Sequence, residues 1–129
     1  MHIVKIDAMK NRLYLSLIGV ISIQEAAKVK DEIINDVANL KPGFDVINDL
    51  SKYIHGDDSA AMYLQEVTRY FIAKEVKRIV RIVGQSKTGL MQFAKYSQLD
   101  GKVNVKYVPT IEEAEQVLST EAGEGDAAE

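Results

Sequence analysis

The sequence predicts a single α/β domain built on a mixed, mostly parallel sheet of five strands with about four helices. Two short segments with alternating apolar residues open the chain, and segments with helical and strand periodicity then alternate three times. Strands that alternate with helices are joined by right-handed crossovers and lie parallel to one another. The expected order is therefore ββαβαβαβα, in which the opening hairpin adds one antiparallel strand.

Periodicity and capping residues place the individual elements. Leu13, Leu15 and Leu17 alternate with other side chains, as in a strand with one buried face. Ser22 and Glu25 have the spacing of a capping box, and apolar residues recur at helical spacing after them. The strands are predicted at residues 3–7, 12–18, 44–50, 77–83 and 103–107, and the helices are predicted to begin near residues 22, 59, 86 and 110.

Composition excludes several classes of protein and of site. The chain has 129 residues, 47% of them hydrophobic and 27% charged, which suits one ordinary globular domain. No apolar run approaches the ~20 residues of a membrane-spanning helix, and the charged N-terminus does not resemble a signal peptide, so a cytoplasmic location is expected. The chain has no cysteine and only two histidines. We therefore expect no disulfide, no metal site and no cofactor.

The last eleven residues differ from the rest of the chain. The segment "STEAGEGDAAE" holds four acidic residues, many small residues and no apolar periodicity. It predicts a domain over residues 1–118 and a disordered acidic tail over residues 119–129. Without that tail, 16 basic residues face 15 acidic ones. This balance gives no reason to expect nucleic acid as a partner.

Two stretches of the sequence, "LIGVIS" and "DLSKYIHGDDSAA", resemble the STAS family, the sulfate-transporter and anti-sigma-factor-antagonist domains. Residues 17–22, "LIGVIS", match the Leu-x-Gly-x-Leu/Ile pattern that ends the second strand in this family. Residues 49–61, "DLSKYIHGDDSAA", match its Asp-Leu-Ser and, after a gap, its Asp-Ser-Ser-Gly before a helix. Ser59 falls on the serine that a partner kinase usually phosphorylates, whereas Asp58 and Ala60 replace the first serine and the glycine. The chain also resembles the divergent STAS-like group that is compared with CRAL-TRIO lipid carriers.

The resemblance implies a non-enzymatic regulatory module that binds a kinase or an anti-sigma-like protein, with Ser59 as the candidate phosphoacceptor. Simple capping of the following helix is the alternative interpretation of this serine. Asp58 adds a permanent negative charge where the helix dipole stabilises anions, and Ala60 favours helix where a glycine would allow close approach. The candidate partner contacts are Ser51, His55, Asp57, Asp58, Ala60 and Tyr63.

The alternative function is that of a carrier or sensor for a small apolar, lipid-like or anionic ligand. The helix after residue 59 has apolar side chains on more than one face, including Tyr63 and Tyr70. Such a face suits a ligand held between this helix and the sheet, or a homodimer contact.

Three further features have competing interpretations. The loop "GQSKTG", residues 84–89, follows a strand and opens a helix but lacks the Gly-Lys-Ser/Thr order of a phosphate loop. Its Ser86 either simply caps that helix or helps to hold an anion at the helix start. His55 and Asp57 could act on Ser59 as a catalytic base, but Ser59 does not lie in a Gly-x-Ser-x-Gly nucleophile elbow, so we expect no catalytic residue. The same two side chains are a weak metal site, because the sequence shows no second cluster of ligands. Arg81 interrupts an apolar strand and predicts a strand near the sheet edge or a side chain that reaches outward. The candidate anion-binding residues are Ser86, Lys87 and Thr88.

Overall fold

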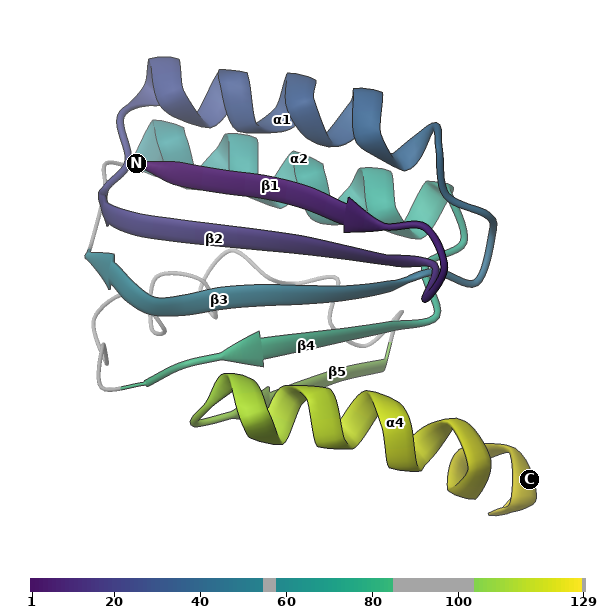
Figure 1. The fold of residues 1–129 in the computed structure, drawn as a ribbon. Coiled ribbons are helices and arrows are strands. Elements are labelled where there is room, and N and C mark those ends of the chain that lie inside the picture. Colours follow the sequence, from purple (N-terminus) through teal and green to yellow (C-terminus); the bar gives the residue numbers. More distant parts are fainter. Residues whose placement is uncertain (55–57, 85–103, 129) are drawn as a thin grey trace.

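The protein, described by a computed structural model over residues 1–54, 58–84 and 104–128, contains a five-stranded sheet with helices on both faces (Figure 1). The strands are β1 (His2–Asp7), β2 (Arg12–Val20), β3 (Asp45–Ile54), β4 (Arg78–Ile82) and β5 (Asn104–Val108). The helices are α1 (Ile23–Val37), α2 (Asp58–Ala73) and α4 (Ile111–Ala128). The helix predicted to begin near residue 86 lies outside the described residues.

The strands lie side by side in sequence order, from β1 to β5. The pair β1–β2 is antiparallel, and β2, β3, β4 and β5 are parallel to one another. This arrangement confirms the predicted α/β class and the mixed, mostly parallel sheet.

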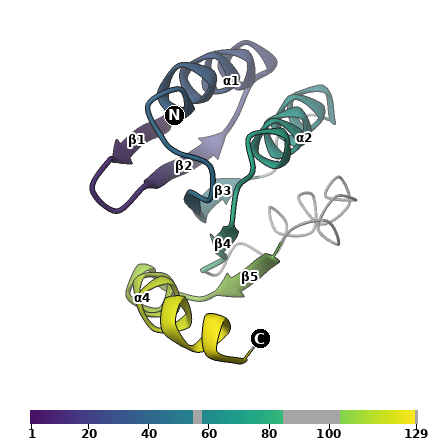
Figure 2. The same ribbon diagram turned by 90° about the vertical axis from the view of Figure 1, so that its right-hand side faces the viewer.

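Two apolar layers hold the helices on the sheet. Helices α1 and α2 lie together on one face, and α4 lies on the other, as Figure 2 shows along the sheet. The larger core lies under α1 and α2 and includes Leu13, Val29, Phe44, Tyr53 and Phe71. The smaller core lies under α4 and consists of Ile47, Val80, Ile82, Val108, Ala114 and Leu118. Alternate residues of the central strands therefore face different helices, as expected for strands covered on both faces.

Side-chain caps are present at two helix starts, and the first of them is the predicted cap at Ser22. The Glu25 backbone N–H donates to the Ser22 hydroxyl oxygen over 3.1 Å at the start of α1. The Glu113 backbone N–H donates to the Thr110 hydroxyl oxygen over 3.2 Å at the start of α4. These bonds satisfy backbone donors that have no partner within the helix.

Three features differ from the sequence-based expectations. β3 continues to Ile54, beyond the predicted end at residue 50. α4 continues as a helix through residues 119–128, where the sequence predicted a tail. Arg81 does not reach outward: it is buried in β4, which lies one strand in from the β5 edge of the sheet and so fits the other prediction, of a strand near the edge. Its Nη1 donates to the Tyr107 hydroxyl over 2.8 Å, and this bond helps to offset the burial of the guanidinium. No described helix is apolar over the length needed to cross a membrane.

Candidate functional site

The candidate site lies at the carboxyl edge of the sheet, on the left of Figure 1. The parallel strands β2, β3 and β4 all end at this edge, where open α/β folds place their ligands. The segment to α2 and the segment that begins at Gly84 both leave the sheet here. His55 and Asp57, together with Ser86, Lys87 and Thr88, lie outside the described residues.

A β-bulge interrupts β3 within the Asp-Leu-Ser segment. Ser16 pairs with Asp49 and Ile18 pairs with Lys52, so two residues of β3, at 50 and 51, face the single residue Leu17. The extra residue shifts the alternation of the strand, because Leu50 and Tyr53 are both buried in the core although they are three positions apart. Bulges of this kind redirect side chains next to functional sites.

Ser51, in the bulge, is held by Asp49 of the same strand and by Gly84 at the end of β4. The Asp49 Oδ1 accepts a hydrogen bond from the Ser51 backbone N–H over 2.9 Å and from its hydroxyl over 2.6 Å. Gly84, with a φ of +52°, lies so close that an added Cβ would fall 2.7 Å from the Ser51 Cβ. The hydroxyl of Ser51 is therefore engaged with Asp49, and the ends of β3 and β4 are in close contact.

Ser59 is exposed in the first turn of α2. The helix begins one residue earlier, at Asp58, so Ser59 lies inside the first turn rather than before it. Ala60 is fully buried, and this leaves its side chain no surface for the partner contact that the sequence suggested. Tyr63 is half-buried against the core, with the Lys30 Nζ 5.9 Å from the centre of its ring. Of the predicted contacts in α2 whose side chains the structure describes, Ser59 and part of Tyr63 are thus available to a partner.

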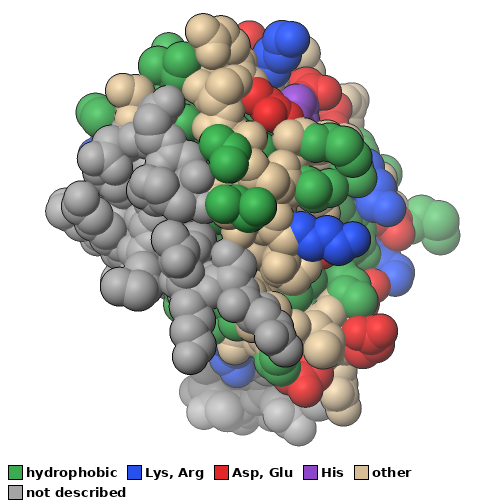
Figure 3. All heavy atoms as spheres, turned by 90° about the vertical axis from the view of Figure 1, so that its left-hand side faces the viewer, with side chains coloured by type: hydrophobic (Ala, Val, Ile, Leu, Met, Phe, Trp, Pro, Cys, Tyr) green, Lys and Arg blue, Asp and Glu red, His purple; other side chains and the backbone are tan. Residues whose placement is uncertain are grey.

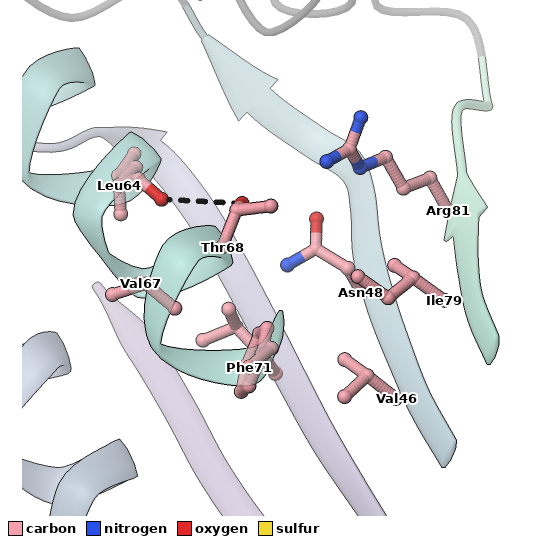
Figure 4. A pocket seen from close by; sticks show the side chains of 9 residues that line it. Val46, Asn48, Leu64, Val67, Thr68, Phe71, Ile79 and Arg81 are labelled. Carbon is pink, nitrogen blue, oxygen red and sulfur yellow. Dashed lines mark hydrogen bonds between the residues drawn. The ribbon is translucent and has the colours of Figure 1, made fainter. Parts of the chain in front are cut away.

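The space between α2 and the sheet is small. Its volume is about 10 Å³, and it is lined by both apolar and polar side chains, shown in Figure 4. Pockets for small molecules usually measure about 300–1,000 Å³, and about 10 Å³ accommodates a single water molecule. The part of this interface that the structure describes therefore has no room for a lipid-like ligand.

A charged cluster beside the edge was not predicted from the sequence. His2 in β1 contacts two carboxylates of α1: its Nδ1 lies 2.8 Å from a Glu25 oxygen, and its Nε2 contacts Glu32. The Met1 ammonium also donates to Glu25, over 3.0 Å. Burial tends to raise the pKa of Glu25, but the hydrogen bonds from His2 and Met1 outweigh it and lower this pKa. The seven-residue spacing of Glu25 and Glu32, which puts them on one helix face, was the available signal.

This cluster does not form a metal site. The two carboxylates approach opposite nitrogens of the imidazole, so the three side chains do not converge on one point. Among the residues that the structure covers, no group of three His, Asp or Glu side chains is arranged to hold a metal ion.

Comparison with known proteins identifies the fold. No protein-family model and no curated protein matches the sequence. An uncharacterized protein of the DUF3478 family with a SpoIIAA-like fold, from Shewanella loihica PV-4, matches 91% of this chain and 93% of its own, with a TM-score of 0.70 and 15% identity. The anti-sigma factor antagonist SpoIIAA in its unphosphorylated form matches 95% of this chain and 99% of its own, with a TM-score of 0.65 and 10% identity. The chain has the SpoIIAA-like fold of STAS domains.

Two further structures complete the comparison. The Bacillus cell fate determinant SpoIIAA in its phosphorylated form matches 90% of this chain and 97% of its own, with a TM-score of 0.62 and 12% identity. A longer chain described as Mglu matches at a TM-score of 0.52 and 23% identity over 64% of this chain, which spans 19% of that protein. The resemblance to STAS domains seen in the sequence is thus confirmed at the level of the fold.

Proposed function

We propose that this STAS-like domain is a non-enzymatic regulatory module that binds a protein partner through the carboxyl edge of its sheet, and that phosphorylation of Ser59 switches this binding. The observation that carries the proposal is the exposed position of Ser59 in the first turn of α2, at the edge where β3 ends. The similarity to an anti-sigma factor antagonist, solved in unphosphorylated and phosphorylated forms, supports the same function.

The surface around Ser59 has the character of a protein-binding site. Figure 3 views the molecule from this edge and shows apolar side chains near the centre of the face, with charged side chains around them. Val20 and Ile54 pair across the ends of β2 and β3 and are 61% and 58% exposed. Exposed apolar groups gathered in this way favour a protein contact, whereas the small cavity under α2 gives no comparable support to a carrier.

The electrostatics of the helix start are compatible with a phosphate. A phosphoserine in the first turn gains from the positive end of the helix dipole, by about 0.3–1 kcal/mol at an exposed site. The neighbouring Asp57 and Asp58 oppose it, because a phosphate adds about −1.5 to −2 charge beside two carboxylates. A partner that recognises the phosphorylated form must therefore offer basic side chains, and one that binds the unphosphorylated form would be repelled.

Native mass spectrometry of the protein isolated from its own cells tests this proposal. We expect a fraction that carries one phosphate, assigned to Ser59 by fragmentation and lost in Ser59→Ala. The same spectrum reports the oligomeric state and any retained ligand. A protein that never carries phosphate at Ser59, under conditions in which its partner is bound and released, would disprove the switch.

Matched variants separate the switch from the binding surface. Ser59→Asp and Ser59→Ala should differ in affinity for the isolated partner, measured by calorimetry. Val20→Asp should abolish binding of the partner, whichever residue stands at position 59, because it places a charge in the exposed apolar surface. Met9→Asp is the control: Met9 is fully exposed in the β1–β2 turn, and its substitution should leave binding unchanged. If Val20→Asp binds as well as the wild type, the proposed surface is wrong even if Ser59 is phosphorylated.

A further inference from the structure

Three polar side chains meet inside the apolar interface between α2 and the sheet. Asn48 from β3, Thr68 from α2 and Arg81 from β4 are 5%, 6% and 1% exposed. Figure 4 shows the amide of Asn48 directed into the space between the other two side chains. The rest of this space is lined by Leu15, Val46, Leu64, Val67, Phe71 and Ile79. Polar groups buried among apolar ones need hydrogen-bond partners, so this cluster requires an explanation.

Asn48 carries the clearest sign of a missing partner. Its Oδ1 is fully buried, and no described residue donates a hydrogen bond to it. An asparagine amide has two acceptor sites and two donors, and most such groups in protein interiors are bonded to protein or to ordered water. A donor therefore belongs beside Asn48 Oδ1.

The other two side chains offer the complementary groups. The Thr68 hydroxyl donates a long hydrogen bond, 3.5 Å, to the Leu64 carbonyl of its own helix, and its oxygen can still accept one. The Arg81 guanidinium lines the same space. Its Nη1 donates to the Tyr107 hydroxyl, and its buried Nε–H makes no hydrogen bond with a described residue. One donor group and two acceptor oxygens thus surround the cavity.

The cavity has the size of one water molecule. Its volume of about 10 Å³ is enough for one water molecule, and an internal water needs two to four polar partners. We propose that one ordered water molecule occupies this cavity, accepts a hydrogen bond from the Arg81 guanidinium, and donates its two hydrogens to Asn48 Oδ1 and Thr68 Oγ1. Each hydrogen and one lone pair of the water then has a partner. As lined by the described residues, the space has no room for a larger ligand.

This water joins α2 to two strands of the sheet. Thr68 lies on the helix that carries Ser59, whereas Asn48 and Arg81 belong to β3 and β4. The bridge gives the otherwise apolar contact a fixed register, because sliding the helix would break the bonds of the water to the sheet and leave Asn48 Oδ1 without a partner. The inference stands whether or not Ser59 is phosphorylated, since it rests on the cavity and its polar lining alone.

Water–protein cross-relaxation in NMR tests the proposal. We expect one cross-peak between water and the Asn48 side-chain amide and a second between water and Thr68. Both should have the sign that indicates a water molecule bound for longer than nanoseconds. A high-resolution crystal structure should show one solvent peak about 2.7–3.2 Å from Asn48 Oδ1 and Thr68 Oγ1.

Two variants at one position make the test specific. Thr68→Val has nearly the same shape but no hydroxyl, so we expect the cross-peaks to be lost and the amide exchange of central α2 to become up to about tenfold faster. Thr68→Ser keeps the hydroxyl and should keep the water. Should Thr68→Val fail to fold, the wild type and Thr68→Ser still decide the matter. A structure in which Asn48 Oδ1 bonds directly to Arg81 with no solvent peak, or cross-peaks that persist in Thr68→Val, would overturn the bridge.

Discussion

Gly84 packs directly against the backbone of Ser51: a Cβ atom built on Gly84 would lie 2.7 Å from the Ser51 Cβ and 2.9 Å from its Cα. Contacts below 3.0 Å are not tolerated without movement, and here the obstacle includes main chain on a bulged strand. Gly84 also has a φ of +52°, in the region that other residues rarely adopt. Glycine at this position therefore allows the ends of β3 and β4 to approach at the candidate site.

Gly84→Ala should lower the free energy of unfolding by about 2–4 kcal/mol, because it combines backbone strain with overpacking against Ser51. Urea denaturation of both proteins measures this difference. Gly43→Ala is the matched control: Gly43 also has a positive φ, +85°, but nothing lies within 4 Å of its added Cβ. It should cost only the conformational part, about 1 kcal/mol. Equal losses in the two variants would show that the contact with Ser51 has no energetic weight.

Arg78 and Asp45 form a buried ion pair between β4 and β3, and its loss should be costly. The Arg78 Nε and Nη2 donate to the two Asp45 oxygens over 3.0 Å and 2.8 Å, and both side chains are almost fully buried. Arg78→Ala leaves a buried carboxylate without its partner, which should destabilise the fold by about 3–5 kcal/mol. Thermal unfolding measures this loss. Lys30→Ala, which breaks an exposed pair with Glu66 between α1 and α2, should change the melting temperature very little. Similar effects of the two substitutions would contradict the importance of burial.

Ala60→Gly should weaken the start of α2. Ala60 is fully buried in the first turn, at the position where the STAS pattern has glycine. The substitution removes a buried methyl group and lowers helix propensity, so the free energy of unfolding should fall by about 1–2 kcal/mol. Hydrogen exchange should show faster opening of the first turn of α2. Unchanged exchange there would mean that this turn is held by other contacts.

Most helices and strands could be predicted from local sequence patterns, because capping residues and apolar periodicity themselves stabilise these elements. Ser22 beside Glu25 predicted the start of α1, and the alternation of apolar residues predicted β2. The end of β3 was predicted too early, because Ser51 and Lys52 break the alternation. The bulge restores it and buries Tyr53. The burial of Arg81 was also missed, since it depends on the Tyr107 hydroxyl from β5, 26 positions away in the sequence.

The candidate site was predictable to a lesser extent. Ser59 was found from the family pattern and is exposed as that interpretation requires. The burial of Ala60 depends on how α2 is turned toward the sheet, which a sequence pattern at the helix start does not define. The spacing of Glu25 and Glu32 indicates only that they share a helix face. Their contacts with His2 were not predicted, because they form only when the antiparallel β1 brings the start of the chain to the carboxyl edge of the sheet.

Glu25 should make the stability of the fold sensitive to acid. Burial raises the pKa of its carboxyl, but hydrogen bonds from His2 and the Met1 ammonium lower it further, so that it lies below the ordinary value of 4.5. The folded state therefore favours the carboxylate, and this contribution is present in full above that value and is lost as the pH falls through the lowered pKa.

Glu25→Gln should remove this dependence, because the amide keeps the shape of the side chain but does not titrate in this range. Urea denaturation at several values from about pH 6 down to about pH 3.5 measures it, and the free energy of unfolding should fall less steeply below about pH 4.5 in the variant than in the wild type. Glu112→Gln is the matched control. Glu112 lies in the first turn of α4, as Glu25 lies in the first turn of α1, but its side chain is exposed. It should leave the acid dependence that Glu25 causes intact. If Glu25→Gln loses stability with acid as steeply as the wild type, the contacts of His2 and Met1 with this carboxylate do not stabilise the fold.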